Sequence, residues 1–189
     1  IDGIGLLFQD LETIEIQNST IELSVGEEPV GIDVNNSADY TTTSVKIHDN
    51  VVAGNGLKTG NSYGILAGED NGSNPNSLQG IEIYDNEVSG FNHCLMVGGN
   101  TGAILARNIV HDNTYGLIMK FTTSSVVKFN LAYNNSTNMY LNKAGTNDVF
   151  YNNTSYSTDV YNTLGFETAS DVTHTTGAIV KNNIFHSTA

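Results

Sequence analysis

Apolar and polar residues alternate in short runs along the chain, and these runs share one frame. The stretches VKIHDNVV at 45–52 and IEIYDNEV at 81–88 both carry apolar residues at alternate places and Asn at the sixth place. Across the chain, the sixth-place residues are Ser19, Asn50, Asn86, Asn108, Asn130, Asn153 and Asn183. Their spacings are 31, 36, 22, 22, 23 and 30 residues. A repeat with its shortest period in the twenties predicts a solenoid.

Within each repeat, the period of two predicts a β-strand with one buried face. A second short strand is expected further along each repeat. These second strands read GIDVN from Gly31, GILAG from Gly64, CLMVG from Cys94, GLIMK from Gly116, NMYLN from Asn138 and GFETA from Gly165. Gly or Asn stands at nearly every junction, which indicates tight turns. We therefore expect an all-β chain of about seven coils whose equivalent strands stack into parallel sheets.

The repeated Asn has a structural interpretation. Asn tolerates the left-handed backbone conformation of a sharp turn, and its amide can both donate to and accept from the Asn of the next coil. Identical residues stacked at strand spacing form such ladders. We expect Asn86, Asn108 and Asn130 to lie in one internal ladder and assign them no catalytic role.

The frames ending in NEV, NIV, NLA and NIF, with the Gly-Ile and Gly-Leu strands between them, resemble the right-handed, single-stranded parallel beta-helix (pectate lyase-like) superfamily. The resemblance covers nearly the whole chain. It implies a secreted or cell-surface protein that handles polysaccharide. The Asp-Pro-His-Glu stretch of alginate epimerases and the Arg-x-Pro-x-x-Arg segment of common pectate lyases are both absent, so neither active site is transferred to this chain.

The 189 residues fit a single domain over 1–189. Seven coils at about 4.8 Å each would form a rod of roughly 33 Å. Terminal coils of solenoids need caps, and neither IDGIG at the start nor FHSTA at the end reads as one. We therefore expect a piece of a longer helix, with flanking coils or a neighbouring domain missing. The longer early spacings predict loop insertions near 24–29, 36–44, 57–62 and 69–79, which would wall one face.

Composition excludes several kinds of partner. The net charge is −13 and the chain has seven Lys and Arg residues, which argues against binding to nucleic acid or to an anionic membrane surface. No apolar run has the length of a transmembrane helix, so membrane insertion is not expected. Cys94 is the single cysteine, which excludes an internal disulfide. It aligns with Gly31, Gly64 and Gly116, so we interpret it as a small packing residue.

Candidate chemistry lies on the outward face of the second strands. If Ile65, Leu95 and Leu117 point inward, the alternate residues point outward. One outward column is then Asp33, Leu66, Met96, Ile118, Tyr140 and Glu167, and the next is Asn35, Gly68, Gly98, Lys120 and Asn142. His93 and Tyr115 precede their strands at matching places. An outward apolar stripe is unexpected on a solenoid and predicts that something covers or contacts it.

The resemblance implies a role for Lys120, because polysaccharide lyases of this superfamily use a Lys, Arg or similar base to abstract the proton beside a uronate carboxylate. Lys120 and His93 are therefore the candidate catalytic residues. The candidate substrate-binding residues are Tyr115, Tyr140, Asn142 and Met96. In these lyases, calcium held by acidic residues neutralises the carboxylate. Calcium is thus the candidate cofactor here. The oxygen-rich stretch at Glu69, Asp70 and Asn71 could supply ligands, but its spacing does not fit an established calcium loop and is more typical of a solvated turn.

Two functions remain open from the sequence. One is an extracellular carbohydrate-active enzyme, a lyase or hydrolase of an acidic polysaccharide. The other is a non-catalytic surface, adhesion or structural solenoid that binds protein or glycan through its apolar stripe. Carbohydrate sites favour aromatic platforms, and Tyr63, Tyr115 and Tyr140 are available, although the chain has no Trp.

Overall fold

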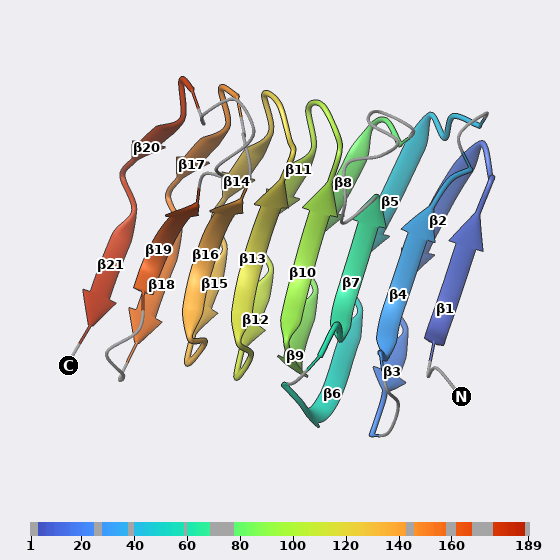
Figure 1. Ribbon diagram of the computed structural model, residues 1–189, viewed down its shortest axis with the longest axis horizontal. Helices are drawn as coiled ribbons and strands as arrows, with labels where there is room; N and C mark the ends of the chain where they lie inside the picture. Colours follow the sequence, from blue (N-terminus) through green and yellow to red (C-terminus); the bar gives the residue numbers. More distant parts are fainter. Residues whose placement is uncertain are drawn as a thin grey trace.

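The strands of the protein are arranged as three parallel sheets wound around one core. A computed structural model describes residues 4–24, 28–37, 40–58, 60–68, 78–142, 146–157, 162–167 and 176–187. In this described part, every coil contributes one strand to each sheet, and each sheet has seven strands. Figure 1 shows equivalent strands following one another from the N-terminal to the C-terminal end. The predicted right-handed parallel β-helix with about seven coils is confirmed.

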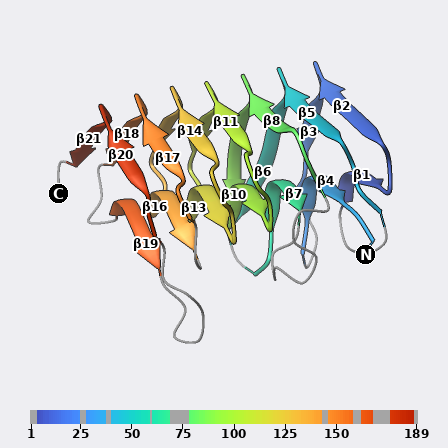
Figure 2. The ribbon, with the colours of Figure 1, turned by 90° about the horizontal axis from the view of Figure 1, so that it is seen from above.

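Sheet A contains β1 (Ile4–Gln9), β4 (Val30–Asn35), β7 (Tyr63–Gly68), β10 (His93–Gly98), β13 (Tyr115–Lys120), β16 (Thr137–Asn142) and β19 (Asn162–Glu167). Sheet B contains β2 (Thr13–Gln17), β5 (Ser44–His48), β8 (Ile81–Tyr84), β11 (Ile104–Ala106), β14 (Val126–Lys128), β17 (Val149–Tyr151) and β20 (Ile179–Lys181). Sheet C contains β3 (Thr20–Glu22), β6 (Val51–Leu57), β9 (Glu87–Phe91), β12 (Ile109–His111), β15 (Leu131–Tyr133), β18 (Thr154–Ser157) and β21 (Ile184–Ser187). Figure 2 shows the three sheets from above.

The core consists of stacks of aliphatic side chains, one from each coil. In sheet A, Ile65, Leu95 and Leu117 occupy equivalent places on neighbouring strands and are fully buried. Sheets B and C add Ile47, Ile83 and Val88 to the same cluster. Apolar side chains at every second place are thus removed from water by the coils on either side, which is the main stabilising contribution in a solenoid.

The predicted Asn ladder runs along the corner between sheets B and C. The Oδ1 atom of Asn86 accepts from the backbone N–H and from the Nδ2 amide of Asn50, at 3.1 and 2.9 Å. The same pair of bonds links Asn86 to Asn108, Asn108 to Asn130, Asn130 to Asn153 and Asn153 to Asn183. Each Asn therefore satisfies backbone and side-chain groups inside the corner, where water does not reach.

The expectation that these Asn residues themselves adopt the left-handed conformation is wrong. The residue before each ladder position has the positive φ angle, which is 56° for Asp85, 55° for Arg107 and 58° for Phe129. The turn is made at this outward residue, so that the following Asn can point into the corner. The ladder position therefore requires Asn, because its amide stacks on the next coil. The residue before it faces solvent, so several residue types occur there.

The last coil differs from the predicted alignment. GFETA from Gly165 was aligned as a second strand, but the strand is β19 and its register places Gly165 beside Tyr140 and Glu167 beside Asn142. Glu167 therefore belongs to the column of Lys120 and Asn142, and not to that of Met96. Gly165 was matched to Gly116, but the strand register continues the place of Gly116 through Asn138 to Thr163, so the alignment was off by two residues.

The predicted insertions are only partly covered by the structure. Residues 25–27, 38–39, 59 and 69–77 lie outside the described residues, and so does the candidate calcium stretch at Glu69, Asp70 and Asn71. The described part of the chain has no helix that is long and apolar enough to cross a membrane.

Candidate functional site

The outward face of sheet A carries a cavity that collects all the site residues predicted from the sequence. The cavity has a volume of about 120 Å³. It is lined by His93, Met96, Tyr115, Ile118, Lys120, Tyr140 and Asn142. Three neighbouring strands, β10, β13 and β16, supply these side chains. We refer to this cavity as the sheet A cavity.

Strand register explains why these residues meet. His93 lies opposite Tyr115, and Met96 lies opposite Ile118. One coil further on, Lys120 lies opposite Asn142. Neighbouring strands are about 4.8 Å apart, so residues paired in this way place their side chains in contact range. Gly98 lies opposite Lys120 on the other side and has no side chain, which leaves space beside the lysine.

One wall of the cavity is built from stacked aromatic rings. The His93 ring lies between Tyr63 and Tyr115, with ring centroids 4.8 and 5.4 Å apart and interplanar angles of 17° and 10°. Tyr115 also stacks on Tyr140 at 5.2 Å. Because the rings cover one another's faces, their edges, hydroxyl groups and ring nitrogens are what they offer to a ligand. The stack also fixes the orientation of His93.

The floor of the cavity is apolar and tightly packed. Met96 and Ile118 point away from the core and yet are only 1 % exposed. They pack with Leu66, Tyr115 and Tyr140 in a cluster separate from the main core. The predicted outward stripe is therefore confirmed, and its cover includes aromatic side chains of the same face. A stripe that is already buried offers little surface to a docking protein.

The polar groups of the cavity are mostly hydrogen-bond donors. Lys120 contributes an ammonium group, Asn142 an amide and His93 an imidazole, while two tyrosines contribute hydroxyl groups. Such a set suits a ligand rich in oxygen atoms, and above all one with a negative charge. Further along the same face, Asp33 accepts from Nδ2 of Asn35 at 3.1 Å, and burial raises the pKa of its carboxyl group.

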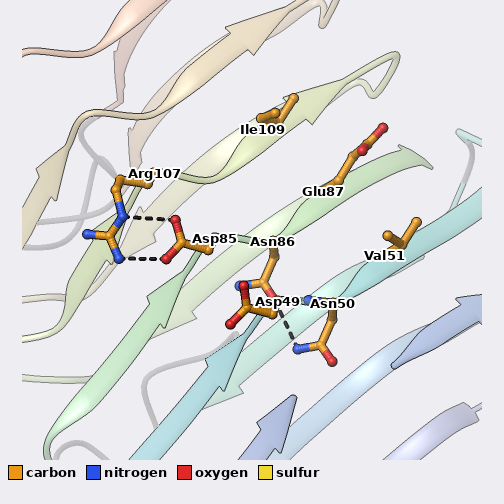
Figure 3. A pocket seen from close by; sticks show the side chains of 8 residues that line it. All are labelled: Asp49, Asn50, Val51, Asp85, Asn86, Glu87, Arg107 and Ile109. Carbon is orange, nitrogen blue, oxygen red and sulfur yellow. Dashed lines mark hydrogen bonds and ion pairs between the residues drawn. The ribbon is translucent and has the colours of Figure 1, made fainter. Parts of the chain in front are cut away.

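A larger cavity at the corner between sheets B and C was not predicted. It has a volume of about 400 Å³ and is lined by Asp49, Asn50, Val51, Asp85, Asn86, Glu87, Arg107 and Ile109 (Figure 3). Arg107 donates to Asp85 from Nε at 2.8 Å and from a terminal nitrogen at 2.6 Å, as expected for residues at equivalent places in neighbouring coils. The cation of this cavity is therefore already paired within the protein, and the remaining charges are acidic. The residues that line the sheet A cavity include a lysine and no acidic side chain, so its lining suits an anionic ligand better.

Other reactive side chains do not gather into a site. Cys94 is fully buried, and burial raises the pKa of its thiol well above its ordinary value, which disfavours the nucleophilic thiolate. Within the described ranges, no three side chains among His, Cys, Asp and Glu converge closely enough to hold a metal ion.

The comparisons agree with this architecture. A comparison with curated proteins gives no match. A family model described as "Periplasmic copper-binding protein (NosD)" matches residues 3–189, which is nearly the whole chain. The chain therefore belongs to the NosD family of parallel β-helix proteins.

Proposed function

We propose that this protein binds an acidic polysaccharide in the sheet A cavity and cleaves it as a lyase. The family is described as periplasmic, in agreement with the secreted location expected from the sequence. The observation that carries the proposal is the convergence of Lys120, His93 and Asn142 in one cavity with the hydroxyl groups of Tyr115 and Tyr140.

Binding would follow from the donor groups of the cavity. The Asn142 amide can donate to an oxygen of a uronate carboxylate, and Lys120 lies beside it on the neighbouring strand. The tyrosine hydroxyl groups can bond to sugar hydroxyl groups. The cavity is smaller than the roughly 300–1,000 Å³ of drug-sized ligand pockets, so it would receive one sugar unit of a chain that extends along the sheet.

The reaction proposed is a β-elimination. A base removes the proton on the carbon next to the carboxylate, the C–H electrons form a carbon–carbon double bond, and the glycosidic oxygen leaves and takes up a proton. Lys120 in its neutral amine form is the proposed base, and His93 is the proposed proton donor to the leaving oxygen. The stacked rings of Tyr63 and Tyr115 would hold the His93 ring in place during proton transfer.

The family description names copper, and the described residues do not fit a copper site. Copper(II) prefers several nitrogen and oxygen ligands arranged around one point, and copper(I) prefers sulfur. His93 and Met96 lie in the same cavity, but the described residues supply no third His, Cys, Asp or Glu beside them. The proposed reaction therefore includes no step that involves copper.

The alternative of a non-catalytic solenoid predicts binding without cleavage. A protein partner on the apolar stripe is disfavoured because Met96 and Ile118 are buried. If a glycan is bound but not cleaved, the cavity is a recognition site and not an active site.

The test is to incubate the protein with polygalacturonate, alginate and glucuronan, with and without calcium. Ultraviolet absorbance reports the unsaturated product, and affinity electrophoresis in the same glycans reports binding. Lys120→Met should abolish product formation, because it removes the proposed base, and should leave most of the binding through Asn142 and the tyrosines in place. Lys46→Met removes a cation from the outward face of sheet B and should change neither. Binding without product in the wild type would support the non-catalytic alternative, and absence of both would refute the proposed function.

A further inference from the structure

Two histidines outside the sheet A cavity have carboxylates on both ring nitrogens. The first is His48 at the end of β5. Its Nδ1 lies 2.7 Å from Oδ2 of Asp49, and its Nε2 lies 3.2 Å from Oε1 of Glu15 in the preceding coil. The His48 side chain is only 10 % exposed, whereas the Glu15 and Asp49 side chains are 55 % and 53 % exposed.

The second histidine, His111 at the end of β12, repeats this arrangement at another corner of the solenoid. Its Nδ1 lies 2.8 Å from Oδ2 of Asp112, and its Nε2 lies 3.3 Å from Oε1 of Glu87 in the preceding coil. In both cases, the Asp directly follows the His and has a positive φ angle, 55° for Asp49 and 58° for Asp112. In both cases, the Glu lies two residues before the partner of the His in the strand register.

A neutral imidazole cannot satisfy this geometry. It has one N–H group and one lone pair, so one of the two carboxylates would face a lone pair instead of a donor. An imidazolium donates to both carboxylates at once. We propose that the Glu15–His48–Asp49 and Glu87–His111–Asp112 clusters are proton-dependent ties between neighbouring coils, which hold the coils together while the imidazole is doubly protonated and weaken when it loses a proton.

The groups that surround each histidine favour the same state. The next coil places the Tyr84 ring on His48, with centroids 4.6 Å apart and planes 4° apart, and places the Tyr133 ring on His111 at 4.8 Å and 7°. A cation above a phenol ring is stabilised by the ring electrons. On the far side of the His48–Tyr84 stack, the Arg107 guanidinium lies 5.5 Å from the centroid of the Tyr84 ring and is paired with Asp85. Lys46 precedes His48 by two residues on β5 and lies opposite Glu82 on β8.

The direction of the pH dependence follows from these contacts. The hydrogen bond to Asp49 raises the pKa of His48 above its ordinary value, against the opposing effect of burial. A group whose pKa is raised by folding stabilises the folded state fully below its unfolded pKa, and this stabilisation is lost as the pH rises through the folded pKa. The tie at His48 is therefore strong in mildly acidic medium and weakens in alkaline medium.

The test has two parts on the intact chain. In the first, histidine side-chain resonances are followed by NMR from about pH 5 to about pH 9. The titration midpoint of His48 should lie above the ordinary histidine value of 6.5. Asp49→Asn keeps a residue that tolerates positive φ and should lower the His48 midpoint. A wild-type midpoint at or below the ordinary value would overturn the proposal.

In the second part, the melting temperature is measured over the same pH range. The wild type should lose about 2–5 °C between the acidic and alkaline ends. The double variant Glu15→Gln and Glu87→Gln can donate an amide hydrogen to a neutral imidazole, so its loss should be less than half as large. Glu22→Gln removes an exposed carboxylate outside both clusters and should behave like the wild type. The same pH dependence in all three proteins would also overturn the proposal.

Discussion

Oδ1 of Asn130 accepts two hydrogen bonds from Asn108 in the preceding coil, one from the backbone N–H at 2.9 Å and one from Nδ2 at 3.0 Å. Nδ2 of Asn108 also donates to the carbonyl oxygen of Ile83 at 2.9 Å. A single side chain thus connects three coils in a corner that excludes water. These contacts predict what happens when the side chain is removed.

Replacing Asn108 by Leu should destabilise the protein by about 1–3 kcal/mol, because the N–H and Nδ2 groups of Asn86 lose their acceptor in a buried corner. Urea denaturation measures the loss. Asn134→Asp changes an exposed Asn at another turn and should have little effect. An unchanged denaturation midpoint for Asn108→Leu would contradict the importance of the ladder.

Replacing Phe129 by Asn should stabilise the protein by about 0.5–1 kcal/mol. Phe129 has a φ angle of 58° and is 51 % exposed, and a bulky residue is strained in this conformation whereas Asn adopts it readily. The change removes one edge contact with the Tyr151 ring. Phe129→Ala loses the same contact without gaining the tolerance of Asn, so it should not stabilise. The two melting temperatures give the comparison, and a gain with Ala as large as with Asn would show that relief of backbone strain is not the cause.

Replacing Asp148 by Asn should stabilise the protein at neutral pH by about 0.5–1.5 kcal/mol. Asp148 is fully buried, and it accepts from the backbone N–H of Ser125 and from the hydroxyl group of Thr122, at 2.8 and 2.7 Å. Burial raises the pKa of its carboxyl group above the ordinary value of 3.8, so ionisation costs more in the folded state than in the unfolded state. This cost grows as the pH rises from that value through the folded pKa, and Asn avoids it.

Urea denaturation at about pH 5 and about pH 7 checks this prediction, because the advantage of Asn should be at least as large at the higher pH. An Asp148→Asn variant that is less stable than the wild type at both pH values would show that the hydrogen bonds to a charged carboxylate outweigh its burial.

Replacing Ile118 by Asn should destabilise the protein by about 2–4 kcal/mol, whereas Ile109→Asn should cost less than about 1 kcal/mol. Both isoleucines point away from the core, but Ile118 is 1 % exposed and Ile109 is 37 % exposed. Chemical denaturation of the two variants provides the comparison. Equal costs would mean that the floor of the sheet A cavity is not a packed cluster.

Much of the architecture could be predicted from the sequence because stacked coils require the same kind of residue at the same place in every coil. The Asn at the sixth place is needed in coil after coil, so it is visible as a period. The columns of Met96 and Lys120 were predicted correctly for the same reason, since Met96, Ile118 and Tyr140 follow one another at 22 residues, as do Gly98, Lys120 and Asn142. In the last coil, Thr163 stands where several earlier coils have Gly, so Gly165 was matched in its place and Glu167 was assigned to the wrong column.

The two Glu–His–Asp clusters could not be found in the same way. Glu15 and His48 are separated by 33 residues, and Glu87 and His111 by 24, so the pairs share no period. Each Glu also lies diagonally across the strand register, so aligning the coils does not bring it beside its His. The repeated sequence His-Asp-Asn, at 48–50 and 111–113, is the signal that points to them. The two copies lie at different corners of the solenoid, so an alignment of the coils does not place them at the same position.

The sheet A cavity is assembled from three successive coils, each of which supplies residues at the same places of its strand. A point mutation can change the side chain at one of these places, but it cannot add a strand to the cavity. Duplication of one 22-residue unit within the gene would add a strand to every sheet and continue both ladder and groove in register. The length of the row of cavity residues is therefore set by the number of repeats in the gene, whereas the chemistry at each place is set by single codons.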